Sequence, residues 1–260
     1  MKKGIELKNG FLDDDLNIEV DRKRKENEDA YKVVEEFNLL MYEIEKKFKK
    51  DNATNRDLYV FTVFEQIHIP SQTYIILIER GLYSDAQIIL RSIYEKILNL
   101  KIVIADENYL NRILKDTLCQ GFSTLKKIKE NQIFELIPES IVKMRMEEYK
   151  NAIEKMNTIK LPMNLSDVAD KVDMKRQYIY YKLLSEYSHN DLVILMQQLI
   201  FKEDGIIING SQMNLKISDE ILRFIECLEY SIRAISQYLK TFEYINKMEY
   251  IQLKYEYIWK

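Results

Sequence analysis

The chain has 260 residues, of which 47% are hydrophobic and 31% charged, so it can bury a core and is too apolar to be disordered. Its six glycines and three prolines leave few turns, which favours long helices over a β-sandwich. The net charge of −3 excludes a nucleic-acid binder that relies on a broad basic face, although a local basic groove stays open. No secretory signal is present, and no apolar run approaches the ~18 residues of a membrane span, so we expect a cytoplasmic protein that does not enter a membrane.

Apolar residues recur at three- and four-residue spacing along most of the chain, which is the pattern of amphipathic helices. The pattern is absent from residues 1–18, so we expect an irregular N-terminal segment followed by a single helical domain over 19–260. Pro70 lies inside the second helical segment and predicts a kink or short break near Ile69. Helices are expected at about 21–50, 56–80, 84–105, 107–130, 138–157, 175–199 and 218–247, with a short one capped by Ser166 or Asp167.

The periodicity changes after residue 199. Asp204 and Gly205 stand between two runs of apolar residues rich in isoleucine, and an Asp-Gly pair in this setting is typical of a β-hairpin. The sequence therefore predicts an all-α fold, a bundle of about seven or eight helices with one small β-hairpin near 200–209.

Two polar residues interrupt the apolar helix expected at 84–105. Arg91 and Glu95 are four residues apart, so they share one helix face. Their neighbours Ile88 and Leu98 are apolar, which indicates that the two side chains face protein and not bulk water. Buried charges need partners that offset their desolvation. The pair is therefore either part of a structural network or part of a functional cleft.

A second pair of polar residues lies in the tyrosine-rich helix expected at 175–199. Ser185 and His189 are again four residues apart and share a face. His189 is a candidate general acid or base, because histidine gains or loses a proton near neutral pH. No strained turn or oxyanion-hole motif accompanies Ser185, so it is not assigned as a triad nucleophile. We expect Glu95, from the other helix, to orient His189.

The chain shows no motif for a cofactor or a metal. Its few glycines form no phosphate-binding loop between a strand and a helix. The other histidine, His68, could share a metal with Glu65 or Glu95, but the spacing matches no standard metal site. Cys119 and Cys227 lie far apart and are expected to be reduced, buried and inert. We therefore predict neither a cofactor nor a bound metal.

Two blocks of the sequence are similar to a known family. The first is an apolar run that follows a glycine turn and ends in Arg91-Ser92-Ile93-Tyr94-Glu95. The second is a tyrosine-rich helix that contains Ser185-Glu186-Tyr187-Ser188-His189. Together they resemble the bacterial domain of unknown function 5677, over about residues 60–210. The resemblance implies a mainly helical fold and brings no established reaction.

More distantly, the chain resembles HEPN domains, which are helical bundles of bacterial toxins and defence ribonucleases. Those domains place an arginine a few residues before a histidine on one helix, which corresponds to 182–184 here, where this chain has a lysine and two leucines. Arg91 would have to supply the guanidinium from a neighbouring helix, and it would hold a phosphate of the RNA. This resemblance implies a metal-independent ribonuclease or toxin of stress or phage defence, with RNA bound at a local site. Its catalytic residues would be Arg91, Glu95, Ser185 and His189.

Two other interpretations stay open. In the first, the same four polar residues form a buried structural network, and the long helices bind a protein partner or self-associate. The C-terminal segment from Tyr238 to Trp259 is rich in tyrosine and would then be a contact surface, because aromatic residues are enriched at interfaces. In the second, the protein senses a small ligand, which requires a closed apolar pocket beside the polar residues.

Overall fold

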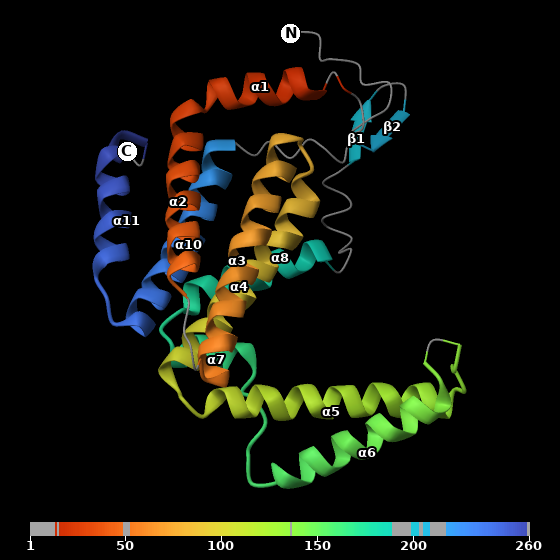
Figure 1. The fold of residues 1–260 in the computed structure, drawn as a ribbon. Helices are drawn as coiled ribbons and strands as arrows, with labels where there is room; N and C mark the ends of the chain where they lie inside the picture. Colours follow the sequence, from red (N-terminus) through yellow and green to blue (C-terminus); the bar gives the residue numbers. More distant parts are fainter. Residues whose placement is uncertain are drawn as a thin grey trace.

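The structure is a computed structural model, and it describes residue 14 and residues 16–48, 53–135, 137–188, 199–202, 205–208 and 217–258. In these residues the fold is all-α apart from one short pair of strands (Figure 1). The helices are α1 (Leu16–Glu26), α2 (Glu28–Lys47), α3 (Asn55–Glu79), α4 (Tyr83–Ala105), α5 (Tyr109–Glu130), α6 (Glu139–Lys155), α7 (Leu165–Lys171), α8 (Lys175–Ser188), α10 (Ile217–Leu239) and α11 (Glu243–Lys254), followed by the 3-10 turn η2 (Glu256–Ile258).

The helices form two parts, a body and an arm (Figure 1). In the body, α3 and α4 make the most extensive helix contact, and α2, α8 and α10 pack around this pair. Fully buried aromatic side chains fill the space between these helices, among them Phe37, Phe64, Tyr74 and Tyr94. Burial of these apolar faces is the main force that assembles the body.

The sequence around the α3–α4 pair explains where both helices begin and end. Thr54 and Asp57 form a reciprocal capping box at the start of α3. At its other end Gly81 has a φ of 78°, and the amides of Gly81 and Leu82 donate to the carbonyls of Ile78 and Leu77. This left-handed cap satisfies the last carbonyls of α3 and reverses the chain, so that α4 returns along α3.

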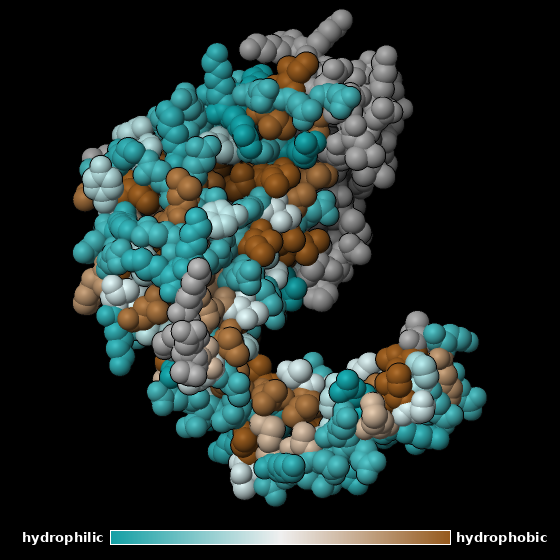
Figure 2. All heavy atoms as spheres, in the orientation of Figure 1, coloured by the Kyte–Doolittle hydropathy of each residue, from teal (hydrophilic) through white to brown (hydrophobic). Residues whose placement is uncertain are grey.

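The arm consists of α5, α6 and the residues between them, and it projects away from the body (Figure 1). Its two helices pack mainly on each other. Gly121 allows their close approach, because a Cβ atom there would lie 2.6 Å from the Tyr149 ring. Figure 2 shows apolar side chains along the side of the arm that faces the body. Leu114 and Met144 are among the exposed apolar residues of the arm.

The described residues contain ten α-helices, so the expected seven or eight is too few. The first expected helix is divided at Asn27, whose side-chain amide donates to the carbonyl of Lys23 at 2.9 Å. The last one is divided at Lys240, which adopts a φ of 54° and ends α10. The sequence gives little warning of either break, because neither position is a glycine or a proline.

Three further boundaries differ from those expected. α1 begins at Leu16, inside the segment expected to be irregular, while residues 1–13 lie outside the described residues. α3 continues through Pro70 without the expected break, and the nearby Ile67, His68 and Ser71 are buried in the core. Asn164 caps α7, accepting from the Asp167 amide at 2.9 Å, so neither Ser166 nor Asp167 is the cap.

Two short strands follow the tyrosine-rich helix α8 along the chain. β1 (Leu199–Lys202) pairs antiparallel with β2 (Gly205–Ile208), and Leu199 lies opposite Ile208. This pairing spans 199–208, one residue earlier at each end than expected. α8 is described as far as Ser188; of the rest of the helix expected at 175–199, residues 189–198 lie outside the described residues and Leu199 belongs to β1. Among the helices that the structure describes, none has the length and apolar character of a membrane span.

Candidate functional site

Arg91 lies on α4 and reaches across to α8. Its Nε donates to the hydroxyl of Ser185 at 3.0 Å, and its Nη2 donates to the hydroxyl of Tyr181 at 3.0 Å. The guanidinium also lies over the Tyr181 ring, 5.0 Å from its centroid. Tyr181 and Ser185 are four residues apart on α8, and the Ser185 hydroxyl donates to the Tyr181 carbonyl at 2.8 Å. These contacts fix the guanidinium in the seam between the two helices.

Glu95 lies one turn further along α4 and is half-buried. The Arg91–Glu95 ion pair that their spacing allows is not formed, because Arg91 turns toward α8. In the described part of the chain, no carboxylate pairs with Arg91, whose partners are two hydroxyls and an aromatic ring. Hydroxyls orient a guanidinium but do not neutralise its charge.

The fourth predicted site residue, His189, lies outside the described residues, so its contact with Glu95 stays a prediction. The structure therefore brings Arg91 and Ser185 together and leaves Glu95 without a side-chain hydrogen bond to either of them. Tyr181 is the residue that the sequence reasoning missed. Its position four residues before Ser185 was the available signal, because it places both hydroxyls on one face of α8.

His68 is buried in the body, and its hydrogen bonds go to residues other than Glu65 and Glu95. Its Nδ1 lies 2.7 Å from Glu45 Oε1, and its Nε2 lies 2.8 Å from Asn38 Oδ1. Both ring nitrogens are thus engaged with neighbouring side chains, as in a structural histidine. Over the residues described, no group of three or more histidine, cysteine, aspartate and glutamate side chains is placed to hold a metal.

A second polar cluster, which the sequence reasoning did not find, is buried between α3, α4 and α10. The Glu220 side chain is fully buried, and its Oε2 accepts from Tyr74 Oη at 2.7 Å and from Gln87 Nε2 at 2.8 Å. Its Oε1 pairs with Arg223 Nη1 at 3.0 Å. Burial and the neighbouring carboxylate raise the pKa of Tyr74 well above its usual value, so its hydroxyl stays a donor.

The comparisons with known proteins concern the same helices. Residues 57–206, more than half of the chain, match the model of a family of unknown function, DUF5677. The chain belongs to the DUF5677 family. The match runs from the first turn of α3 into β2, close to the region of 60–210 expected from the resemblance, and it includes Arg91, Tyr181 and Ser185. Searches of curated proteins and of solved structures found no match.

The DUF5677 helices α4 and α8 also form most of a small pocket, whose third wall is α10. Its volume is about 210 Å³. Gln87 and Arg223 from the buried cluster line one part of it, and leucine side chains with the rings of Tyr94 and Tyr180 line the rest. The two rings stack on each other, with centroids 6.2 Å apart. The pocket therefore combines an apolar, aromatic wall with two fixed polar groups.

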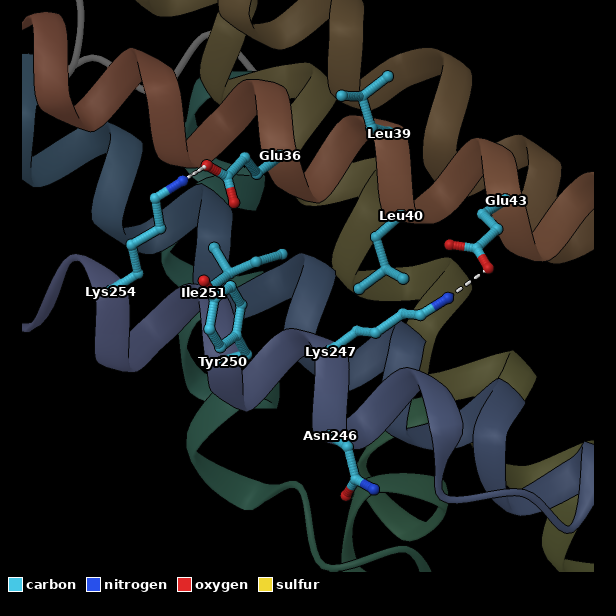
Figure 3. Close-up of a pocket in the computed structure, with 9 residues that line it drawn as sticks. All are labelled: Glu36, Leu39, Leu40, Glu43, Asn246, Lys247, Tyr250, Ile251 and Lys254. Atoms are coloured by element: carbon cyan, nitrogen blue, oxygen red, sulfur yellow. Dashed lines mark hydrogen bonds and ion pairs between the residues drawn. The ribbon is translucent and has the colours of Figure 1, made fainter.

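A larger groove of about 610 Å³ lies between α2 and α11, outside the DUF5677 match (Figure 3). The ion pair of Lys254 with Glu36 crosses it near one end. Leu39 and Tyr250 line the groove, and each is 66% exposed. This groove therefore presents apolar surface to solvent. It is formed by other helices than the Arg91 seam, by which we mean Arg91 on α4 with Tyr181 and Ser185 on α8.

Both cysteines are free. Cys227 is buried, and this burial raises the pKa of its thiol above the ordinary value. A thiol without thiolate character is a poor nucleophile, which agrees with the expected inert cysteine. Cys119 lies on the arm and is only partly buried, so the expectation of burial is wrong for this residue.

Proposed function

We propose that the Arg91 seam binds a phosphate group of RNA and that the protein cleaves RNA without a metal ion. The observation that carries the proposal is the charge of Arg91, which no carboxylate among the described residues compensates. Two of the five N–H donors of the guanidinium serve hydroxyls of α8, which leaves donors for the oxygens of a phosphate.

The roles of the other residues follow from their chemistry. Tyr181 and Ser185 hold the guanidinium plane, so Arg91 loses little side-chain entropy when it binds an anion. His189 follows Ser185 by four residues in the sequence and is proposed as the general acid or base for the 2′-hydroxyl or the leaving oxygen. Glu95 is proposed to orient His189. The distant resemblance to HEPN domains supports RNA as the substrate and a setting of stress or phage defence.

The test is cleavage of total cellular RNA in the presence of EDTA by the wild type, His189→Ala and Arg91→Lys. Arg91→Lys keeps the charge and removes the planar fork. Arg176→Lys is the matched control, because Arg176, on α8, also lies over a tyrosine ring, that of Tyr180, but is exposed. We expect cleavage by the wild type and Arg176→Lys and its loss in the other two variants, with thermal stability recorded for all four. RNA that stays intact in the presence of folded wild type would contradict the proposal.

A second candidate function is a non-catalytic interaction module, and the groove between α2 and α11 favours it (Figure 3). In the tyrosine-rich C-terminal segment, Tyr244 and Tyr255 are buried, whereas Tyr250 and Tyr257 are exposed. An amphipathic helix of a partner could bury Tyr250 together with Leu39. Sedimentation of the wild type and of Leu39→Lys would test self-association through this groove. If both proteins are monomers at all concentrations, self-association through this groove is ruled out.

A further inference from the structure

The pocket between α4, α8 and α10 carries an inference that is independent of the proposed cleavage at Arg91. Its polar part is built around Glu220, a carboxylate with no exposed surface. Gln87 is only 2% exposed, and its amide nitrogen donates to Glu220 Oε2 at 2.8 Å. This bond sets which way the amide points, so the Gln87 oxygen is the acceptor that remains for a ligand.

Arg223 supplies the complementary groups. Its Nη1 is bound to Glu220 Oε1 at 3.0 Å, and in the described part of the chain its Nε and Nη2 have no hydrogen-bond partner. The guanidinium is already neutralised by Glu220, so the pocket has no net charge to attract an anion. The polar part thus offers one fixed acceptor and neighbouring donors, which suits a neutral group with an N–H beside a carbonyl.

The remaining walls restrict the shape of the ligand. Tyr94 and Tyr180 contribute aromatic surface, and three leucines complete the lining. Planar rings bind well against such surfaces. A volume of about 210 Å³ corresponds to roughly seven water molecules in the liquid, which is enough for one small ring and not for a whole dinucleotide.

We infer that this pocket binds a small, uncharged planar ring with a lactam edge, of the kind found in uracil. The lactam N–H donates to the Gln87 side-chain oxygen, and the adjacent carbonyl accepts from Arg223. The ring lies against the tyrosine and leucine walls. Such a ring can come from a free base or nucleoside or from an unpaired base of RNA, and both sources present the same edge.

The direct test is titration of the full chain with two probes, 1-methyluracil and 1,3-dimethyluracil, followed by NMR or calorimetry. The first keeps the N3–H between two carbonyls, and the second replaces that hydrogen by a methyl group. We expect 1-methyluracil to bind roughly tenfold or more tightly than 1,3-dimethyluracil, because the Gln87 oxygen loses its donor in the second complex. Absent binding of 1-methyluracil, or equal binding of the two probes, would overturn the inference.

A pair of variants locates the binding. Leu183 lines the pocket, and Ile179 lies one turn earlier on α8 without lining it; both are exposed, so both tolerate a larger side chain. Leu183→Phe should abolish 1-methyluracil binding, and Ile179→Phe should leave it unchanged. Unchanged binding in Leu183→Phe would overturn the assignment to this pocket. Tighter binding of hexauridylate than of uridine would identify RNA as the source, and equal affinity would identify a free ligand.

Discussion

The guanidinium of Arg91 and the hydroxyl of Ser185 join two helices across 94 residues of sequence, through a hydrogen bond of 3.0 Å. The same guanidinium bonds the Tyr181 hydroxyl and lies over its ring. The seam between α4 and α8 therefore depends on one cation for both its polar contacts and its proposed chemistry. Because Arg91 has both roles, a substitution there is expected to change both the stability of the protein and the binding of a ligand, so the two effects have to be measured separately.

Arg91→Ala should lower the free energy of unfolding by roughly 1–3 kcal/mol. It removes two hydrogen bonds from a charged donor, and the hydroxyls of Tyr181 and Ser185 lose that donor. Urea unfolding at neutral pH measures the loss. Arg176→Ala is the control, because Arg176 is exposed and its contact with Tyr180 is not part of the seam. We expect no measurable change there. Equal midpoints for Arg91→Ala and the wild type would show that the seam does not need this side chain.

Lys240→Gly should stabilise the protein by roughly 0.5–1 kcal/mol. Lys240 is exposed and holds a φ of 54°, a left-handed conformation that costs a side chain more than it costs glycine. The turn itself is satisfied, since the Thr241 amide donates to the Ser236 carbonyl at 3.1 Å. Lys240→Ala keeps the strain and removes the charge, so it should not raise the melting temperature. A gain in Lys240→Ala equal to that in Lys240→Gly would contradict the backbone explanation.

Gly121→Ala should loosen the arm, although alanine is the better helix former by about 1 kcal/mol. The added Cβ would lie 2.6 Å from Cε2 of Tyr149, so α5 and α6 would have to separate or the ring to move. Hydrogen exchange should rise in the arm and stay unchanged in α3 and α4. In a Tyr149→Ala background the clash is gone, and Gly121→Ala should then be stabilising. The same sign in both backgrounds would rule out the contact as the cause.

Asp106 should make stability depend on pH at the junction of α4 and α7. The hydrogen bond from Lys171, at 2.9 Å, lowers the pKa of Asp106 from its ordinary value of 3.8. The folded state therefore binds this proton more weakly than the unfolded chain does. The stability is present above the ordinary pKa and is lost as the pH falls through the lower folded pKa.

Asp106→Asn tests this dependence. At pH 7 it should cost no more than roughly 0.5–1 kcal/mol, because Lys171 is partly exposed and solvent screens the pair. Urea unfolding of both proteins between neutral pH and the folded pKa should show the difference shrinking on acidification. A difference that does not change with pH would assign the effect to packing and not to charge.

Local sequence signals predicted the helices well wherever a cap or a glycine marks an end. Thr54 and Gly81 bound α3 almost where the pattern of apolar residues placed it. The helix breaks at Asn27 and Lys240 carry no such signal. At Asn27 the side-chain amide bonds the Lys23 carbonyl, and at Lys240 a lysine adopts a left-handed conformation. After these breaks α1 packs on α2 and α3, and α11 packs on α2 and α10, and a single segment of sequence does not reveal such contacts.

The candidate site was predictable to a similar extent. Arg91 and Ser185 stood out because they are polar residues in apolar helices, and the structure joins them. The four-residue spacing of Arg91 and Glu95 allows an ion pair, whereas the hydrogen-bond partners of Arg91 lie on another helix. Glu220 escaped notice altogether, because an acidic residue in the first turn of a helix is expected at a solvated end. Its partner Tyr74 is 146 residues away.

The arm has a consequence for how the chain tolerates change. It leaves the body after α4 and returns at α7, and these two helices pack on each other (Figure 1). The two ends of the arm are therefore already held together without it, and loop-closure entropy grows only slowly with length. Replacement of the arm by a short glycine-rich turn should yield a smaller protein with an intact Arg91 seam. In the same way, one or more turns could be added to both helices, which would alter the reach of the arm while the core keeps its packing.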